Sequence, residues 1–249
     1  MSTFEKIQGR NIRSLSSDPS PAAAGEMWYN STSKSLKGVV LTGAWSASGS
    51  LNVSRSIAGL NAGTQTTGIA FGGYTAAPTA NTTSTETYNG SSWTNVTALT
   101  TARRAGAGFG VQTAAVLGGG YQPGGATSGT EEYNGSAWTG GGNMPAGFHN
   151  TSGCGTLTAG LSNGASESPT QTCKYDGTSW AAASSLPSGR TQGGTAGTSA
   201  GAIAAGGFSS NTDSYEWGGS AWTAGPDLNS GRSGGNGMFG ISTAAIIGG

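Results

Sequence analysis

The sequence has little charge. Only 9% of its 249 residues are Asp, Glu, Lys or Arg, and the 11 basic and 11 acidic side chains cancel; an average soluble domain has roughly 25% charged residues. Nucleic-acid binding needs a basic surface, so we expect no nucleic-acid partner. No apolar run approaches the roughly 20 residues that span a bilayer, and the N-terminus lacks the apolar core of a signal peptide, so we expect no membrane insertion.

Cysteine and histidine are also scarce: the chain has Cys154, Cys173 and His149 alone. One histidine and two cysteines supply too few ligands for a zinc cluster. A nucleophilic triad needs its histidine beside an acid and a nucleophile, and nothing in the sequence places them together. We therefore expect no metal, no cofactor and no enzymatic activity.

Glycine, by contrast, is abundant, with 47 residues, and it belongs to a repeat. In each copy an aromatic residue is followed by Asn-Gly, Asp-Gly or Gly-Gly and, five places after the aromatic residue, by Trp. Asn-Gly favours a type I′ turn, which needs positive φ at both central residues, so each copy predicts a tight hairpin. The hairpins are Tyr88 to Trp93, Tyr133 to Trp138, Tyr175 to Trp180 and Trp217 to Trp222.

Two further anchors share this register. Ten residues after each Trp stands an Arg, replaced once by Phe148, and short apolar runs then end in paired glycines, except near residues 157–160, where the third copy is degenerate. The distance from the glycines to the next aromatic residue varies, which marks a surface loop. The anchors are Arg55, Arg103, Arg190 and Arg232, with Gly72-Gly73, Gly118-Gly119, Gly206-Gly207 and Gly248-Gly249.

Four short strands in each unit of 40 to 50 residues are typical of a β-propeller blade. The glycine pair, Tyr, Trp and the following Arg resemble the kelch repeat over residues 36–249. The prediction is an all-β, five-bladed kelch-like β-propeller with four antiparallel strands per blade. Residues 36–40 and 43–46 form a hairpin that pairs with the C-terminal strands and closes the ring, which removes an open edge.

The arginines have two interpretations. They begin the innermost strands, on the face where the variable loops emerge. Their guanidinium groups either brace the blades through carbonyl contacts, which we favour, or bind carboxylate or phosphate, as the resemblance to kelch domains that bind acidic peptides implies. The candidate ligand-facing or blade-bracing residues are Arg55, Arg103, Arg104, Arg190 and Arg232.

The tryptophans of the repeat are predicted to pack between blades, with sugar stacking by one of them as the alternative. They are Trp45, Trp93, Trp138, Trp180 and Trp222.

The two cysteines are placed by the same register, Cys154 on the first strand of the third blade and Cys173 on its third strand. Alternate strands lie roughly 10 Å apart, and a disulfide needs Cα atoms within about 7 Å. We expect two free thiols.

Residues 1–35 precede the repeat and are interpreted as an attachment arm and hairpin; the alternative for the first 24 residues is a disordered tail. Gly25-Glu26-Met27-Trp28-Tyr29-Asn30 and, after a turn, Leu36-Lys37-Gly38 resemble a segment of tailed-phage tail fibres and appendages. Combined with the kelch-like units, the chain resembles kelch-like structural proteins of marine phages. The predicted docking residues are Phe4, Ile7, Ile12, Trp28 and Tyr29.

These resemblances imply a non-enzymatic structural protein located in the virion, as a tail fibre, appendage or head decoration. It would bind tail or capsid proteins through its arm, occur in multiple copies and present its propeller to a host-surface glycan or protein. The main alternative is a glycan- or peptide-binding propeller outside a virion, and a cellular scaffold is a further class. An enzyme would need metal ligands or an acid pair at the channel mouth, and the sequence shows neither.

Overall fold

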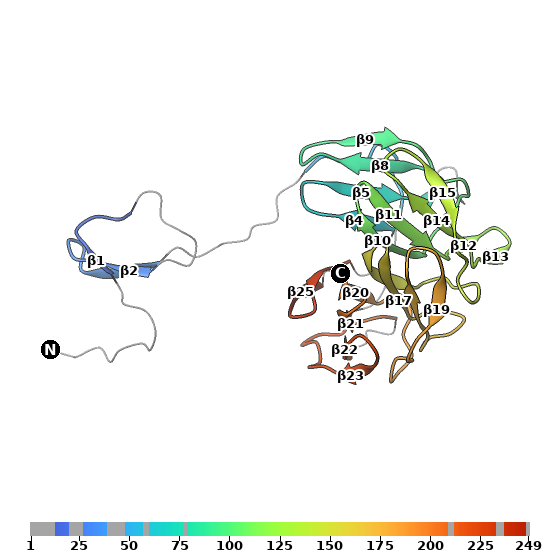
Figure 1. The fold of residues 1–249 in the computed structure, drawn as a ribbon. Coiled ribbons are helices and arrows are strands. Elements are labelled where there is room, and N and C mark those ends of the chain that lie inside the picture. The colour runs from blue at the N-terminus through green and yellow to red at the C-terminus, as the bar shows by residue number, and fades with distance from the viewer. Residues whose placement is uncertain are drawn as a thin grey trace. The chain divides into compact units, whose positions relative to one another are not determined.

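The structure is a computed structural model that describes residues 13–19, 27–38, 48–56, 60–76, 79–208, 212–232 and 237–247. The chain divides into two compact units, Met1–Ala47 and Ser48–Gly249. Figure 1 shows the strands of both units. The described residues form strands, turns and loops and no helix, so the fold is all-β.

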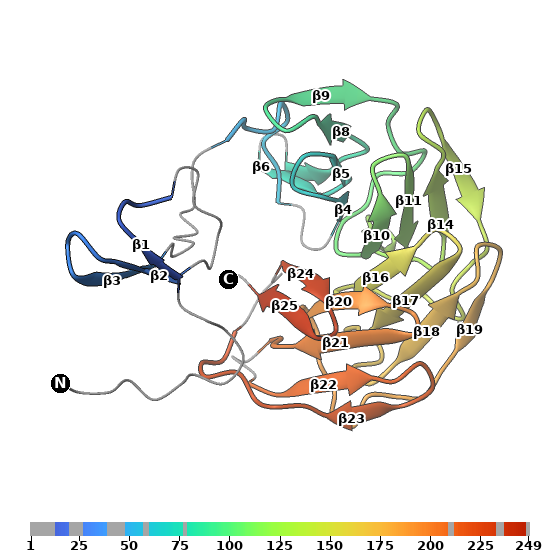
Figure 2. The ribbon, with the colours of Figure 1, turned by 60° about the vertical axis from the view of Figure 1, so that its left-hand side comes forward.

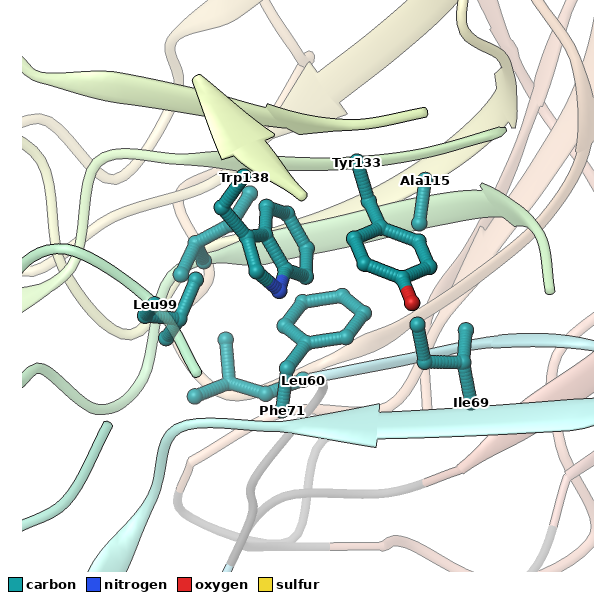
Figure 3. Close-up of a cluster of buried hydrophobic side chains, with 8 residues drawn as sticks. Leu60, Ile69, Phe71, Leu99, Ala115, Tyr133 and Trp138 are labelled. Atoms are coloured by element: carbon teal, nitrogen blue, oxygen red, sulfur yellow. The ribbon is translucent and has the colours of Figure 1, made fainter. Parts of the chain in front are cut away.

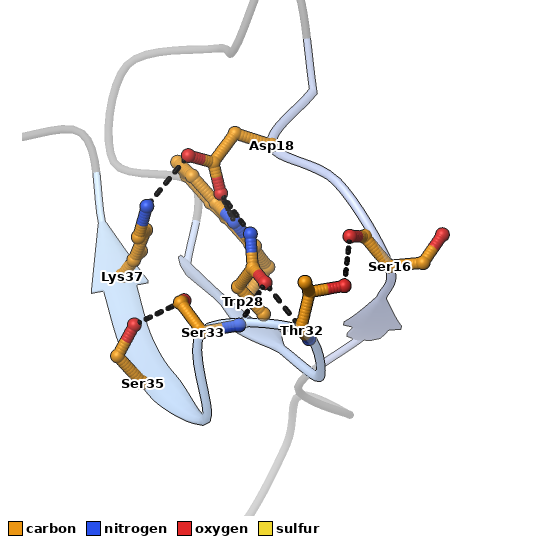
Figure 4. Close-up of polar contacts among 8 residues, drawn as sticks. Ser16, Asp18, Trp28, Thr32, Ser33, Ser35 and Lys37 are labelled. Atoms are coloured by element: carbon orange, nitrogen blue, oxygen red, sulfur yellow. Dashed lines mark hydrogen bonds and ion pairs between the residues drawn. The ribbon is translucent and has the colours of Figure 1, made fainter.

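The N-terminal unit contains a three-stranded sheet. Strands β2 (Met27–Asn30) and β3 (Ser35–Gly38) form an antiparallel hairpin, as the alternating pattern predicts, and β1 (Arg13–Leu15) pairs parallel to β2. Strand β1 lies in a polar stretch that the sequence does not mark as a strand. Asp18, just after β1, connects the strands of this sheet. It accepts hydrogen bonds from the side chains of Trp28 and Asn30 and forms an ion pair with Lys37 (Figure 4).

The described residues of the C-terminal unit form four four-stranded antiparallel sheets and three two-stranded ones. Sheets 1 to 4, in chain order, carry the repeat. Sheet 1 is β4 (Asn61–Gly63), β5 (Gly68–Phe71), β8 (Thr85–Tyr88) and β9 (Trp93–Val96); sheet 2 is β10 (Ala107–Val111), β11 (Ala114–Gly118), β14 (Thr130–Tyr133) and β15 (Trp138–Gly141); sheet 3 is β16 (Ser152–Thr156), β17 (Ala159–Asn163), β18 (Thr172–Tyr175) and β19 (Trp180–Ala182); sheet 4 is β20 (Gly194–Thr198), β21 (Gly201–Ala205), β22 (Ser214–Trp217) and β23 (Trp222–Ala224).

Sheet 5 consists of β24 (Met238–Ile241) and β25 (Ala244–Ile247) among the described residues. The first strands of the five sheets lie side by side in the order β4, β10, β16, β20, β24. Figure 2 shows these strands gathered at the middle and the fourth strands of sheets 1 to 4 at the rim. This arrangement is consistent with a β-propeller-like fold.

The two remaining small sheets are hairpins inside the variable loops. β6 (Tyr74–Ala76) pairs with β7 (Thr79–Asn81), and β12 (Tyr121–Gln122) pairs with β13 (Gly125–Ala126). Each hairpin connects the second and third strands of its sheet, in sheets 1 and 2 respectively. The extra loop length of these two repeats is therefore ordered.

The predicted type I′ geometry of the turns before the tryptophans is wrong. Positive φ occurs at the glycine alone, with Gly90 at 96° and Gly135 at 92°, so the turns are not type I′, which needs positive φ at both central residues. The Asn precedes the glycine and its side chain caps the turn: Asn89 Oδ1 accepts the backbone N–H groups of Ser91 and Ser92. The hairpins themselves are confirmed, because Tyr88 pairs with Trp93.

The third glycine pair is also corrected. Gly72, Gly119 and Gly206 have φ between 61° and 68°, and the residue with φ 65° in sheet 3 is Gly164, which follows β17. Its neighbour is Ala165, so the pattern is Gly-Ala and lies later than residues 157–160. A side chain here would also meet the next sheet, since a Cβ at Gly119 would lie 2.6 Å from the Phe148 carbonyl oxygen. The glycine with φ near 65° is the fixed element, and in sheet 2 it is Gly119, so the equivalent pair there is Gly119-Gly120 and not Gly118-Gly119.

Adjacent sheets are joined by apolar clusters. Between sheets 1 and 2, Trp138 packs edge-on against Phe71, with ring centroids 4.9 Å apart, above Leu60 and Leu99 (Figure 3). Phe109 and Trp180 meet in the same way between sheets 2 and 3. These aromatic contacts pack each sheet against the next one.

A groove of about 590 Å³ lies between sheets 4 and 5. Its walls include Ala205, Ser214, Leu228, Met238 and Ala245. The N-terminal hairpin expected to close the ring falls mainly on residues 39–47, which lie outside the described residues, whereas Leu36 and Lys37 belong to β3.

Candidate functional site

Arg103 is a brace within sheet 2. Its side chain is 2% exposed; Nη1 donates to the Gly129 carbonyl oxygen at 3.0 Å and Nη2 to Glu131 Oε1 at 2.6 Å. Glu131 also accepts the backbone N–H groups of Thr100 and Thr101. Desolvation lowers the pKa of Arg103, and the carboxylate of Glu131 opposes that shift. Arg103 thus ties the loop before β10 to the start of β14, and it does not begin the strand itself.

Arg55 repeats the arrangement in sheet 1. Its Nη1 donates to Glu86 Oε1 at 2.8 Å and Nη2 to the Ala70 carbonyl oxygen, while Glu86 accepts the N–H groups of Asn52 and Val53. Both charged side chains are fully buried. Burial lowers the pKa of Arg55, again opposed by its glutamate. These two arginines have the bracing role.

Arg190 braces sheet 4 through backbone carbonyl groups, with the charge of Asp213 nearby. It donates to the carbonyl oxygens of Gly206 and Asp213, and its Cζ lies 4.8 Å from the centroid of the Tyr215 ring. Tyr215 occupies the strand position that Glu131 has in sheet 2. Desolvation lowers the pKa of Arg190 as well. Arg232, before sheet 5, has interactions of its own and stays half-buried.

Sheet 3 replaces the ion pair with neutral groups. Phe148 stands in the arginine position and Cys173 in the glutamate position, and both are buried in one apolar cluster. Pro145 occupies the place of Thr100, so the backbone N–H that Glu131 accepts in sheet 2 does not exist here. Gln171 takes over the carbonyl contact, because its Nε2 donates to the Gly164 oxygen at 3.1 Å.

Sequence reasoning missed the buried acids Glu86 and Glu131. The signal was present, because each stands two residues before the repeat Tyr, and in sheet 3 that position changes to Cys173 where the arginine position changes to Phe148, although in sheet 4 Tyr215 stands there with Arg190 retained. Cys154 and Cys173 are free thiols on the first and third strands of sheet 3, as predicted. Burial raises the pKa of Cys154 to about 12 and of Cys173 to about 11.

Three of the repeat tryptophans pack between sheets. Each indole Nε1 donates to a hydroxyl at the start of the third strand of the preceding sheet: Trp138 to Thr85, Trp180 to Thr130 and Trp222 to Thr172, at 2.9 to 3.1 Å. Trp93, in sheet 1, is half-buried and packs on Tyr88. Trp45 lies outside the described residues. Ser214 is the next residue in the hydroxyl series and lines the groove beside sheet 5.

We use the term loop face for the surface where the loops before the first strands meet the loops after the glycine pairs. A backbone hydrogen bond joins the two loops of each sheet: the N–H of Tyr74, Tyr121, Ser166 or Phe208 donates to the carbonyl of Ser56, Arg104, His149 or Thr191, respectively. These hydrogen bonds show that the two loops lie on the same face in sheets 1 to 4, as predicted.

Arg104 is the arginine that reaches the loop face. Its Cζ lies 4.6 Å from the ring centroid of Tyr74 and 4.8 Å from that of Tyr121. Nη1 donates to Asn81 Oδ1 at 3.0 Å, and Asn81 in turn donates to the Tyr121 carbonyl oxygen. Arg104 is half-buried, so its guanidinium group is held in place while part of it stays open to solvent.

His149 continues the row on the loop face. Its ring meets Tyr121 edge-on, with centroids 5.1 Å apart, and Nδ1 is hydrogen-bonded to Glu167. Partial desolvation alone would raise the pKa of Glu167, but the backbone N–H and ring of His149 outweigh it and the pKa is lowered. The row Tyr74, Arg104, Tyr121, His149 and Glu167 spans sheets 1 to 3.

In the N-terminal unit, the predicted docking residues separate by face. Trp28 is buried against Asp18, whereas Tyr29 is 39% exposed, next to Met27 at 51% and Leu36 at 55%. Tyr29 pairs directly with Leu36, so these side chains share one face of the hairpin. Phe4, Ile7 and Ile12 lie outside the described residues.

No protein-family model matches the chain, and no curated protein matches it. Within the described ranges, no cluster of three or more His, Cys, Asp or Glu side chains has the arrangement of a metal site. The same part of the chain holds no helix long and apolar enough to cross a membrane.

Proposed function

We propose that the protein is a non-enzymatic structural component of a tailed-phage virion, in which the N-terminal unit docks on tail or capsid proteins and the propeller-like unit contacts the host surface. The observation that carries the proposal is the Gly25–Gly38 segment, which resembles tail-fibre sequences and lies within a compact unit of its own, Met1–Ala47.

The docking surface we assign is the apolar face of the hairpin, formed by Met27, Tyr29 and Leu36. Exposed apolar side chains that gather on one face mark an interaction surface, which favours a protein partner on that face. The other face is occupied by the Asp18 network. If the tail or capsid proteins that bind this face are arranged symmetrically, each particle carries several copies of the protein.

The test is electron microscopy and mass spectrometry of particles purified from the source, followed by complementation with full-length variants. Leu36→Asp places a charge on the docking face and is expected to remove the protein from particles. Lys34→Asp, in the exposed turn between β2 and β3, is the matched control and is expected to leave incorporation unchanged. Particles that never contain the wild-type chain would refute the virion assignment.

For the architecture, we propose a five-bladed ring in which residues 39–47 complete the fifth blade. Three sheet interfaces contain an indole that donates to a hydroxyl, and the groove beside Ser214 is the fourth place of that kind. Trp45 is the one tryptophan of the repeat left to fill it. This proposal supports a disc-shaped unit that presents the loop face outward.

A further inference from the structure

Arg104 differs from the bracing arginines in the hydrogen bonds that its guanidinium N–H groups donate. Arg103 uses its guanidinium group on Gly129 and Glu131 and is 2% exposed. Arg104 uses Nη1 on Asn81, and no other acceptor for its N–H groups is found among the residues that the structure describes. A half-buried guanidinium group with open donors can form two parallel hydrogen bonds to a carboxylate.

The surroundings of Arg104 fix its orientation in advance. Tyr74 and Tyr121 lie against the guanidinium group, and Asn81 holds one nitrogen while it also binds the loop of Tyr121. Stacking on aromatic rings reduces the freedom that an arginine loses on binding. The side chain therefore starts in the geometry that a ligand needs.

The charge balance restricts the ligand. Glu167 is hydrogen-bonded to His149, and Arg104 is the one arginine or lysine side chain of the row. An acidic peptide or a polyphosphate is best recognised by several cations, whereas one guanidinium group suits one carboxylate. The flanking tyrosines add apolar ring surface and hydroxyl groups, which fit the mixed polar and apolar faces of a sugar.

We propose that the loop face binds a carboxylate-bearing glycan, with the carboxylate on Arg104 and the sugar against Tyr74 and Tyr121. This inference names the ligand of the host contact and in that sense rests on the proposed function. Asn81 is a positioning residue, and the exposed ring of Phe208, on sheet 4, offers a second apolar contact on the same face for a longer chain.

The experiment measures binding of the purified full-length protein to sialyllactose, to neutral lactose and to a triaspartate peptide by titration calorimetry and NMR. Sialyllactose is expected to bind and lactose to bind at least about tenfold more weakly, the usual loss when a charge-assisted pair is removed. Arg104→Gln should reduce sialyllactose affinity by about tenfold, and Arg104→Lys, which keeps charge but not the fork, by a smaller factor.

Lys34→Gln, which removes an exposed cation from the other unit, is the matched control and should not change affinity. Equal binding of both sugars, no binding of either, tighter binding of the peptide, or unchanged affinity in Arg104→Gln would each overturn the proposal. A lower melting temperature of that variant with unchanged affinity would leave Arg104 as a structural link between loops. Sugar binding by the purified protein is independent of particle incorporation, so the two proposals fail separately.

Discussion

At the residue scale, the pair Arg103 and Glu131 shows how one position depends on another. Arg103→Phe would leave the Glu131 carboxylate buried without its cation, and we expect a loss of about 3 kcal/mol in the free energy of unfolding. Glu131→Cys would leave the guanidinium group unpaired, with a similar loss. The double variant copies sheet 3, where Phe148 and Cys173 pack together, and should lose less than the two single losses added.

Thr100→Pro added to the double variant should recover further stability, because it removes the backbone N–H that Glu131 accepted, as Pro145 does in sheet 3. Chemical denaturation of the wild type, the two single variants, the double variant and the triple variant measures the coupling. Additive losses in the double variant would contradict a shared Arg–Glu unit.

A second residue-scale prediction concerns Asp18. Its hydrogen bonds and ion pair, that from Lys37 first, lower its pKa to about 2 from 3.8. Because the folded pKa lies below the unfolded one, the carboxylate stabilises the hairpin at pH values above 3.8, and this contribution is lost as the pH falls toward 2. Lys37→Gln should move the pKa of Asp18 up toward 3.8.

NMR titration of the Asp18 carboxyl carbon and the Trp28 indole N–H measures this shift. Lys34→Gln is the control, because Lys34 is exposed on the turn, and the pKa of Asp18 should stay near 2 in it. An unchanged pKa in Lys37→Gln would show that Trp28 and Asn30 hold the carboxylate without the lysine.

At the element scale, sheet contacts depend on the indole–hydroxyl bonds. Thr130→Val would leave the buried Nε1 of Trp180 without an acceptor, and we expect a loss of about 1–3 kcal/mol in unfolding free energy. Thr130→Ser keeps the hydroxyl, as Ser214 does naturally, and should lose less. Denaturant unfolding of both variants measures the difference, and a larger loss in Thr130→Ser than in Thr130→Val, which keeps a methyl group at this position, would assign the effect to packing of the threonine methyl group.

The strands and their order in each sheet follow from the sequence because Trp, Tyr and the glycines repeat in register. Features that depend on how neighbouring repeats pack against one another do not follow from the sequence. The displacement of the third glycine pair to Gly164 was hidden by Ala165, since what repeats is a left-handed backbone at one residue and not the letter pair. Likewise, β1 is held by pairing with β2 and by Asp18, neither of which a short polar stretch reveals.

The site divides in the same way. That arginines brace the sheets was the favoured interpretation, and the contacts of Arg55, Arg103 and Arg190 have that form. The distinction between Arg103 and its neighbour Arg104 was not predictable, because it depends on Tyr74 and Tyr121 from two different loops. Arg104 and Tyr74 are far apart in the sequence, and they come into contact because sheets 1 and 2 pack side by side.

At the scale of the whole molecule, the proposed fifth blade can be tested in the full chain. If Trp45 donates to Ser214 as Trp222 does to Thr172, then Trp45→Phe and Ser214→Ala should be coupled by about 1 kcal/mol in a double-mutant cycle. Trp45→Phe combined with Thr172→Val is the control and should be additive. Additivity in both cycles, measured by denaturant unfolding, would place the indole of Trp45 elsewhere.

The direction of the indole bonds has a consequence for synthesis. In each of the three described interfaces the donor lies on the later sheet and the acceptor on the earlier one. In these three interfaces a newly made sheet therefore finds its hydroxyl partner already folded when its last strand leaves the ribosome, whereas the proposed contact of Trp45 with Ser214 can form only after sheet 4 has been made. Assembly can follow the order of translation, one sheet at a time, and a ribosome that stalls between repeats leaves a stack whose finished interfaces are complete.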